Sequence, residues 1–594
     1  MRNKVRNMAT DVGKEKVANG PEDVPSMWPG IGTIVGDAST GEFTFILKSF
    51  KSRVGDIVAV PMDVPNNDYS SNQSIIAWGR ILSIYRYNPF FPYESAQELS
   101  QGEISLQDTV LSESRDQLEA KVLVLGFTSA DVSRDLNLYP LTYPIPPAAS
   151  VRYPPASAIK MLLIGGLGNM TRLPIGTLIA RSDVPVEIAA QRIASRHLAI
   201  LAMTGGGKTV AARRVIRGFI ELGYPLLILD PHGDYLGLWE RREKLFPNTK
   251  VRLYYPHIVM TKGNKDIVKV LISKMTKGLS EAQQDFLNWV LAQVEASVGE
   301  PVVNYINTLI LVSTRLADKN KEVTGEDKGK KFTGPTARAV RRSLEIVRDS
   351  LIKMEVSNKR LREILNDLTF EELPDPEAQP ESVVKPWQVS ILYLGGYDHL
   401  TQSTIVSILM ETLFSHRAEL SNRIPPFLTV VEEAHNFVPS SKEGTADTPS
   451  LDTLQKVITE GRKFGVGLVL ITQRPSRVDE TVLSQCNTFL VLRLVNPKDQ
   501  SYVRSVMENL PESDAARLPG FGPGQGIISG QAVRFPLQVS IKFDEDMVGT
   551  RTGDEDFIKQ AKDWEPDKHA ETRAKASDLG DKLERLNRRG RKRS

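Results

Sequence analysis

Hydrophobic positions along the chain fall into short runs whose spacing changes from one segment to the next. Between residues 26 and 157 the runs are brief and apolar and polar positions alternate, as in Glu42–Ile46. This pattern is typical of antiparallel strands in a small β-barrel. Strands are predicted at Gly32–Val35, Phe43–Leu47, Ile57–Val60, Ile75–Ile84 and Lys121–Leu125. The proline-rich stretch Tyr139–Pro155 predicts an extended connection that leaves the barrel.

From residue 158 the predicted strands are largely apolar segments: Ile159–Ile164, Ile175–Ile179, Leu198–Leu201, Pro225–Leu229, Val389–Leu394, Phe427–Val431, Leu468–Thr472 and Phe489–Leu494. The continuous apolar run Pro225–Leu229, which ends in acids, is typical of a buried parallel strand. Helical segments lie between many of the predicted strands. Two further segments, Gly524–Gly530 and Phe535–Ile541, predict a closing hairpin.

A helical pattern interrupts the predicted sheet between residues 273 and 386. A capping box at Ser280–Gln283 precedes an apolar stripe from Phe286 to Val294, and a second helix is predicted from Pro301 to Leu316. A third helix has a stripe from Val340 to Leu351, and a shorter fourth helix is predicted at Lys359–Leu368. The segment therefore predicts a helical bundle inserted into an α/β core.

These patterns predict an α/β fold with an N-terminal β-barrel and a helical insertion. The expected parts are a polar arm at 1–25, the barrel and its strap at 26–157, the first half of the core at 158–272, the insertion at 273–386, the second half at 387–545 and a charged tail at 546–594. The tail carries a narrow apolar stripe and ends in RRGRKRS. Such a basic end is either a solvated terminus or a segment that attracts nucleic acid.

Composition excludes several classes of protein. The net charge of the 594 residues is +3, so any surface for nucleic acid must be local. The single cysteine, Cys486, excludes a disulfide framework and a cysteine zinc site. No apolar run approaches the roughly 18 residues of a membrane span. The polar N-terminus lacks the apolar stretch of a signal peptide, and we expect a cytoplasmic protein.

One stretch carries the strongest chemical signal. His197–Val210 reads HLAILAMTGGGKTV, in which an apolar strand is followed by three glycines, Lys208, Thr209 and a helical segment. This order is typical of a phosphate-binding loop, where glycine backbones surround phosphate oxygens and the helix directs its positive end at them. Lys208 reaches the β- and γ-phosphates and Thr209 binds Mg²⁺ in such loops. The predicted nucleotide contacts are Thr204, Gly205, Gly206, Gly207, Lys208, Thr209 and Val210.

Ala202 departs from the usual loop pattern, which has glycine at that position. Taken alone, the motif also fits a glycine-rich turn that precedes a surface lysine.

Polar groups follow three other apolar runs, where a parallel sheet would place them at one edge near the phosphate loop. Glu432 and Glu433 follow Phe427–Val431, and Gln473 follows Leu468–Thr472. Because neighbouring strand residues point in opposite directions, we expect different roles for the two acids. Glu432 is assigned to the metal, Glu433 to the general base and Gln473 to sensing the γ-phosphate or the attacking water. Asp230 is placed near the same loop, or it begins an Asp-Pro turn.

Arg462 lies at the predicted end of a helix, in the sequence EGRKFG. Either it complements the negative end of that helix, or it reaches the γ-phosphate bound by a neighbouring subunit. The second role requires an oligomer whose active sites lie at subunit interfaces.

Together, the motifs RHLAILAMTGGGKT, LILDPHGDY, TVVEEAHNFVP, EGRKFGVGLVLITQRPS and LSQCNTFLVLRLVNPKD resemble the HerA branch of the HerA–FtsK family of DNA-pumping ATPases. The resemblance covers roughly residues 30–540. It implies a RecA-like P-loop core that binds ATP and Mg²⁺, a barrel of the HerA type and a homohexameric ring that moves duplex DNA. It also implies a nuclease partner similar to NurA, docked on the barrel side, in the processing of DNA ends for recombinational repair.

The same resemblance implies roles for individual residues. Lys208 and Thr209 would be the Walker A residues, Glu432 and Glu433 the Walker B acids, and Gln473 the polar sensor. Arg462 would be the arginine finger that acts across the interface, Arg196 a second nucleotide-sensing arginine, and Asp230 a residue near the metal. Glu432 stands where aspartate is commoner.

The sequence fits two functions. The chain is either a DNA motor, or an ATP-gated ring that organises and activates an effector enzyme in a bacterial anti-phage defence complex. The candidate loops for holding DNA are Ser440–Pro449 and Tyr397–Gln402.

Overall fold

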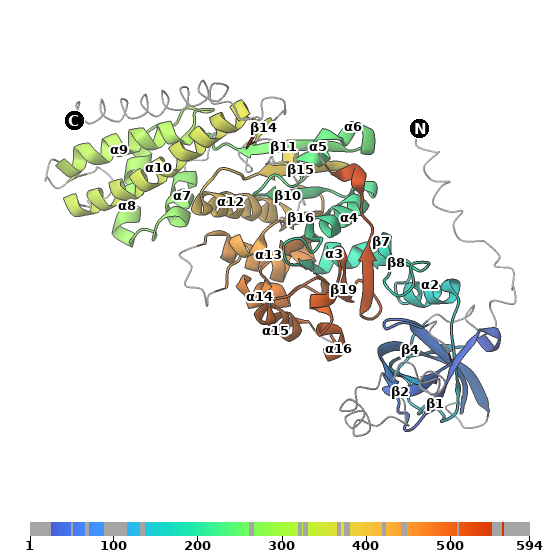
Figure 1. Ribbon diagram of the computed structural model, residues 1–594. Coiled ribbons are helices and arrows are strands. Elements are labelled where there is room, and N and C mark those ends of the chain that lie inside the picture. Colours follow the sequence, from blue (N-terminus) through green and yellow to red (C-terminus); the bar gives the residue numbers. More distant parts are fainter. Residues whose placement is uncertain are drawn as a thin grey trace.

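The computed structural model describes most of the chain outside its two ends. The described residues are 25–48, 52–65, 71–87, 116–130, 137–260, 266–318, 323–324, 331–364, 370–373, 380–418, 423–440, 448–507, 510–548 and 561–562. Figure 1 shows a barrel at one end of the molecule, a large α/β core in the middle and a group of helices at the other end. The predicted arm and charged tail, with its apolar stripe, lie almost entirely outside the described residues.

The N-terminal part is the predicted closed barrel, with strand order β1-β2-β5-β4-β3-β6. In β2 the side chains of Phe43, Phe45 and Leu47 point into the barrel and are buried, which accounts for the alternation in the sequence. All five predicted runs lie in its first five strands. The strands are β1 (Gly30–Val35), β2 (Glu42–Leu47), β3 (Ile57–Pro65), β4 (Asn72–Tyr87), β5 (Gln117–Ser129) and β6 (Ser150–Arg152).

The core is a single sheet of twelve strands in the order β14-β11-β15-β10-β16-β17-β9-β18-β19-β20-β7-β8. The pairs from β14 to β18 are parallel, and those from β18 to β8 are antiparallel. The strands are β7 (Arg172–Leu178), β8 (Pro185–Ala189), β9 (Leu198–Leu201), β10 (Leu226–Asp230), β11 (Lys250–Pro256), β14 (Phe370–Leu373), β15 (Gln388–Tyr393), β16 (Phe427–Val431), β17 (Val466–Thr472), β18 (Thr488–Leu492), β19 (Gln525–Gly530) and β20 (Leu537–Ile541). The predicted closing hairpin is the pair β19–β20.

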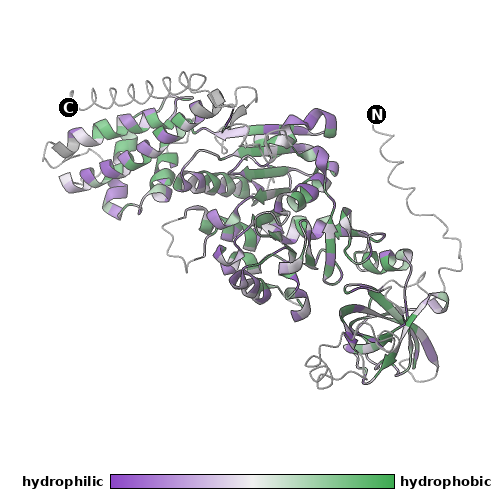
Figure 2. Ribbon diagram, viewed as in Figure 1, coloured by the Kyte–Doolittle hydropathy of each residue, from purple (hydrophilic) through white to green (hydrophobic). Residues whose placement is uncertain are grey.

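Helices cover both faces of this sheet, and their apolar sides pack on its buried strands (Figure 2). Helix α4 covers one face, and α12 and α13 cover the other. The helices of the core are α2 (Ala156–Gly165), α3 (Ala190–Arg196), α4 (Lys208–Glu221), α5 (Leu236–Glu240), α6 (Arg242–Leu245), α11 (Pro380–Val383), α12 (His399–Ala418), α13 (Ser450–Phe464), α14 (Glu480–Ser484), α15 (Pro497–Val506) and α16 (Glu512–Ala515).

The helical insertion shares one continuous apolar core with the sheet, in addition to burying its own stripes. Its elements are α7 (Ile267–Met275), α8 (Glu281–Gln293), α9 (Val302–Asp318), the short pair β12 (Val323–Thr324) and β13 (Lys331–Phe332), and α10 (Gly334–Ile364). The capping box of Ser280 and Gln283 is present at the start of α8. The insertion is therefore anchored on the same sheet face as α12 and α13.

Two sequence predictions of local structure are wrong. Ile159–Ile164 was expected to form a strand but belongs to α2, where Ile159, Leu162 and Leu163 bury one helical face. A short apolar run cannot by itself distinguish a strand from a buried helix. The predicted third and fourth helices of the insertion are continuous through residue 364 in α10, because glycine and proline are absent after Pro335.

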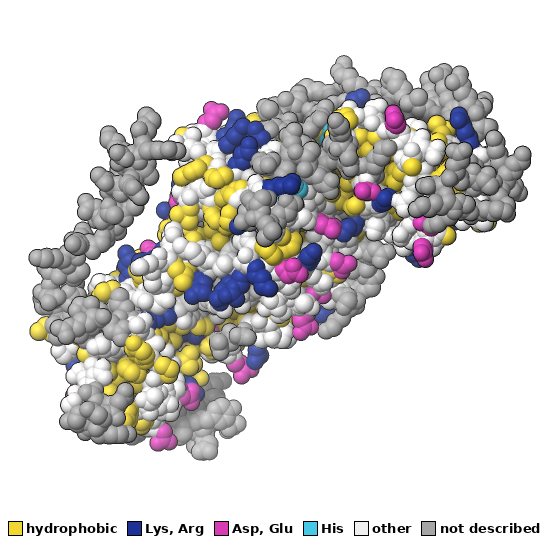
Figure 3. Space-filling view, turned by 180° about the vertical axis from the view of Figure 1, so that it is seen from behind, with side chains coloured by type: hydrophobic (Ala, Val, Ile, Leu, Met, Phe, Trp, Pro, Cys, Tyr) yellow, Lys and Arg dark blue, Asp and Glu magenta, His cyan; other side chains and the backbone are white. Residues whose placement is uncertain are grey.

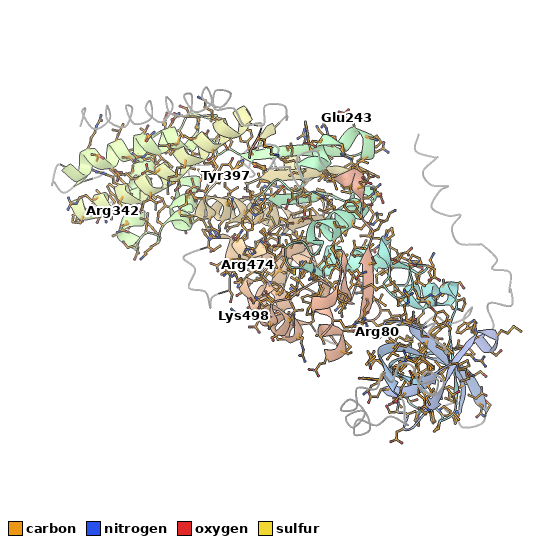
Figure 4. The ribbon with its side chains drawn as sticks, viewed as in Figure 1. Arg80, Glu243, Arg342, Tyr397, Arg474 and Lys498 are labelled. Atoms are coloured by element: carbon orange, nitrogen blue, oxygen red, sulfur yellow. The ribbon has the colours of Figure 1, made fainter. Side chains whose placement is uncertain are left out.

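A buried ion pair joins the barrel to the core. Arg80 of β4 donates a hydrogen bond from Nη2 to Oδ2 of Asp514 on α16, at 2.5 Å, and both side chains are 2% exposed. The second oxygen of Asp514 accepts a hydrogen bond from Gln538 of β20 at 2.9 Å. Figure 4 shows Arg80 on the side of the barrel that faces the core. Arg80 therefore links the barrel with the antiparallel half of the sheet, in addition to the apolar contacts between them.

We expect Arg80→Ala to destabilise the protein by about 3 kcal/mol, because it leaves the carboxylate of Asp514 buried beside one amide. The measurement is the thermal unfolding midpoint, together with the rate of proteolysis within residues 137–155. Arg86→Ala is the matched control on the same strand, since Arg86 pairs with Asp116 at the surface and is 53% exposed. Its expected cost is below about 1 kcal/mol. Equal effects of the two variants would contradict the role of the buried pair.

Candidate active site

The glycine-rich loop connects β9 to α4 and has the geometry of a phosphate cradle. Gly205 and Gly207 have φ values of 75° and 94°, a region in which other residues are strained. A Cβ on Gly207 would lie 2.5 Å from the backbone nitrogen of Gly524. Helix α4 begins at Lys208, so the free N–H groups of its first turn, with Thr209 and Val210, lie next to the loop.

Ala202 fits the loop without distortion. Its side chain is fully buried in the apolar core beneath the loop, and its φ lies outside the left-handed region. Its backbone N–H donates to the carbonyl of Thr472 at 3.2 Å. The departure from glycine at this position therefore leaves the shape of the loop intact.

Lys208 lies between the two strand-end acids. Its Nζ is 2.6 Å from Oε1 of Glu432 and 2.5 Å from Oε1 of Glu433. Burial opposes its charge, but the two carboxylates outweigh burial and raise the pKa of Lys208. The structure thus brings Lys208 to two adjacent acids that lie more than 200 positions away in the sequence, because β9 and β16 both flank β17 and end at the same edge of the sheet.

Glu432 is fully buried, and a tyrosine fixes its orientation. The hydroxyl of Tyr235 donates to Oε2 of Glu432 at 2.8 Å. Burial raises the pKa of Glu432 to about 7, although Lys208 and Tyr235 both lower it. A carboxyl group with such a pKa is partly protonated near neutral pH, and a cation placed next to it would favour the ionised form.

Asp230 organises the turn that presents this tyrosine. Its side-chain oxygens accept hydrogen bonds from the backbone N–H groups of four residues: His232, Gly233, Asp234 and Tyr235. Burial raises the pKa of Asp230 to about 6, while the hydrogen bond from Tyr235 lowers it. The geometry favours the Asp-Pro turn over a position beside the metal, because these N–H groups already surround the carboxylate.

Glu433 adopts an unusual backbone conformation, with φ 49° and ψ 50°. A residue with a side chain is strained in this left-handed region, and such strain is held in place by surrounding contacts. One contact is the Lys208 pair, and another is His435, whose Nδ1 lies 3.3 Å from Oε2 of Glu433. The conformation turns the carboxylate of Glu433 toward Lys208 at the N-terminus of α4.

Gln473 directly follows β17 and faces the phosphate loop. The hydroxyl of Thr204 donates to Oε1 of Gln473 at 2.5 Å. An amide in this position touches the loop itself, so it is suited to respond when phosphate enters.

The donor set fits Mg²⁺ bound together with a nucleotide. Oε1 of Glu432 is buried, and its partner in the structure is Nζ of Lys208 at 2.6 Å. If Lys208 moves to a bound phosphate, this oxygen becomes available to a hard cation. Among the described residues, no group of three or more His, Cys, Asp or Glu side chains could hold a metal. Mg²⁺ characteristically uses one or two protein ligands plus phosphates and water, and Thr209 with Glu432 would be those ligands.

Arg196 and Arg462 lie together, but at the opposite edge of the sheet. Arg196 ends α3 before β9, and Arg462 lies in the last turn of α13 before β17. Burial, then the positive charges of Arg462 and Arg192, lower the pKa of Arg196. Arg196 also donates to Oε1 of Gln531. Because β17 is seven residues long, about 20 Å separates Arg462 from the edge that holds Lys208.

Sequence reasoning missed Tyr235 and His435. Both belong to motifs that were noted, LILDPHGDY and TVVEEAHNFVP, but their contacts depend on elements far away in the chain. Of the two candidate DNA loops, residues 441–447 lie outside the described residues. In the other, the Tyr397 side chain is buried and its hydroxyl bonds to Asn358.

A glycine loop between a parallel strand and a helix, with a lysine that faces two strand-end acids, defines a class of protein: the P-loop ATPases. Comparison with known proteins narrows this class. Residues 173–413 match the family model described as "Helicase HerA, central domain". This part of the chain is similar to that family's central domain.

Relatives named as HerA helicases match over a larger part of the chain. The chain is 29% identical over 407 residues to "DNA double-strand break repair helicase HerA" of Pyrococcus furiosus, covering 62% of this chain and 69% of that protein. It is 28% identical to the protein of the same name from Sulfolobus acidocaldarius, covering 90% and 98%. It is also 28% identical to "Probable helicase MJ1565" of Methanocaldococcus jannaschii, covering 92% and 96%.

Among solved structures, VirB4 of Thermoanaerobacter pseudethanolicus is similar at 14% identity and a TM-score of 0.41, covering 63% of this chain and 97% of that chain. In the part of the chain that the structure describes, no helix is long and apolar enough to cross a membrane.

Proposed function

We propose that the chain is an ATP-driven translocase of duplex DNA that assembles as a homohexamer and serves a nuclease in the processing of DNA ends for recombinational repair. The observation that carries the proposal is the split site. The phosphate loop and its acids lie at one edge of the sheet, and Arg462 and Arg196 lie at the other. Relatives that match most of the chain are named as DNA double-strand break repair helicases.

Hydrolysis would use the groups that converge on the N-terminus of α4, where Lys208 lies. The N–H groups of the loop and Lys208 would hold the β- and γ-phosphates, so Lys208 would leave the carboxylates on which it lies. Thr209 and Glu432 would hold Mg²⁺, which supplies charge neutralisation on the phosphates. Glu433 would accept the proton of the attacking water, and Gln473 would contact the γ-phosphate or that water.

The position of Arg462 supports an oligomer. An arginine about 20 Å from the phosphate loop of its own chain cannot reach the γ-phosphate there. A head-to-tail ring would bring the arginine edge of one subunit to the phosphate edge of the next. The three neighbouring arginines Arg192, Arg196 and Arg462 would then supply positive charge to a bound nucleotide.

Duplex DNA would be held by its phosphates, because a motor must bind every sequence alike. Lys and Arg side chains gather in local patches over the core in Figure 3, although the net charge of the chain is only +3. Arg474 and Lys498 are both exposed, and Figure 4 labels them. A nuclease similar to NurA would dock on the barrel, which lies at one end of the molecule in Figure 1.

The test is the steady-state rate of ATP hydrolysis with and without linear duplex DNA, with the molar mass measured by light scattering in the same buffer. We expect a hexamer whose ATPase rate rises severalfold with duplex DNA. A monomer with an unchanged rate would overturn the proposal. A hexamer that ignores DNA would overturn the motor and favour the scaffold of an effector enzyme.

A further inference from the structure

His435 lies at a junction between the general base and the strand that carries the sensor. Its Nδ1 is 3.0 Å from the hydroxyl oxygen of Thr472, the last residue of β17, and 3.3 Å from Oε2 of Glu433. Its side chain is 12% exposed, so water competes weakly for these contacts. The same ring nitrogen thus faces two oxygens, one from each of the two strand ends that form the site.

The contact is positioned from both sides by backbone geometry. Glu433 is held in the left-handed region, and the short 3-10 turn Ala434–Asn436 that follows brings His435 back beside it. Thr472 is fully buried, and its hydroxyl oxygen also accepts a hydrogen bond from the backbone N–H of Arg474 at 3.0 Å. The hydroxyl oxygen of Thr472 thus holds the Nδ1 side of the imidazole ring in place.

The carboxylate of Glu433 needs such a partner. Its Oε1 pairs with Lys208, but its Oε2 is buried and accepts no hydrogen bond of good geometry. If Lys208 moves to a bound phosphate, the carboxylate loses its main restraint while its backbone remains strained. His435 is then the side chain that remains beside Oε2 among the contacts described here.

We propose that His435 is the positioning residue of the general base: once Lys208 has moved to the phosphate, its Nδ1–H is shared between the hydroxyl oxygen of Thr472, which keeps the ring in place, and Oε2 of Glu433. The proposal deepens the proposed function and rests on Glu433 acting as the base. The ring transfers no proton to the substrate and does not contact the phosphate. It restricts Glu433 to the orientation in which the carboxylate can receive the proton of water.

The proposal also explains why the two strand ends are connected. Beyond Thr472, the exposed residue Arg474 begins a segment that runs beside the one that follows His435. Two backbone hydrogen bonds join these segments, from Ser440 to Arg477 at 2.8 Å and from Asp479 to Val438 at 2.9 Å. The segment after β17 therefore lies directly beside the segment that follows His435.

The test compares His435→Ala and His435→Asn in the full-length protein with saturating duplex DNA. We expect His435→Ala to lower kcat by about 10- to 100-fold and to leave KM and the affinity for a non-hydrolysable ATP analogue within about twofold. The asparagine amide can donate from nearly the same place as Nδ1, so His435→Asn is expected to recover most of kcat. Thr472→Val is expected to lower kcat less, and to add little to His435→Ala in the double variant.

His257→Ala is the matched control, because His257 pairs with Glu355 through Nδ1 at 3.0 Å, away from the phosphate loop. It is expected to hydrolyse ATP like the wild type. The inference is overturned if His435→Ala keeps the wild-type kcat, or if kcat and nucleotide affinity fall together and asparagine restores neither. If Glu433→Gln still hydrolyses ATP, the assignment of the base itself fails, which is a distinct result.

Discussion

Replacing Glu433 by glutamine is expected to lower ATP hydrolysis by about 10²- to 10⁴-fold while nucleotide binding persists. The amide has the shape of the carboxylate but cannot accept the proton of the attacking water. Lys208 keeps its second partner, Glu432, at 2.6 Å, so the lysine is still held by an ion pair beside the phosphate loop. The measurements are phosphate release under saturating ATP and the affinity for a fluorescent ATP analogue.

The control for this variant is Glu243→Gln, which makes the same chemical change on a side chain that is 87% exposed and pairs with Arg242. This control is expected to leave both measurements unchanged. Glu243 lies in α6, far from the barrel (Figure 4). Substantial hydrolysis by the Glu433 variant would contradict the assignment of the base. Loss of nucleotide affinity in parallel with rate would instead point to a collapsed site.

Replacing Arg462 by alanine is expected to lower kcat by about 10³-fold or more, in the range seen for arginine fingers. The guanidinium is exposed at the end of α13, on the sheet edge opposite the phosphate loop, so its loss leaves the subunit's own site untouched. Lys463→Ala, one position further in the same turn, is the matched control and is expected to retain the wild-type rate. A full rate in the Arg462 variant would show that it only complements the end of its helix.

Mixing the two inactive variants separates action within a subunit from action between subunits. When an Arg462→Ala subunit binds ATP beside a Glu433→Gln subunit, the first provides an intact base and the second provides an intact arginine. Random assembly makes about a quarter of the interfaces complete, so activity is expected to reappear on mixing. An arginine that acted within its own chain would leave the mixture inactive.

The convergence of the site could be predicted because it depends on topology. Lys208, Glu432, Glu433 and Gln473 each follow a continuous apolar run, and parallel strands align such ends at one edge. The barrel could be predicted from alternation in strands such as β2. By contrast, Ile159–Ile164 forms part of a helix and not the predicted strand, because five apolar residues in a run of six fit a helix and a strand equally well.

Contacts that depend on side-chain packing between distant elements could not be predicted. Tyr235 and Glu432 are 197 positions apart, and their hydrogen bond depends on the turn that Asp230 holds. Arg80 and Asp514 are 434 positions apart, and their pairing depends on how the barrel docks. No periodicity in the sequence encodes such pairs. The role of Asp230 shows the same limit, since an acid after a strand suits a metal site and a turn equally well.

Displacement of a third strand from a DNA triplex tests the central claim, motion along duplex DNA, most directly. The substrate carries a triplex-forming strand at one end of a linear duplex, with tracts of increasing length before it. We expect ATP-dependent displacement with a lag that grows with tract length, and we expect Glu433→Gln to abolish it. If duplex DNA stimulates ATP hydrolysis but the third strand stays bound at every length, the protein does not translocate and the central claim is wrong.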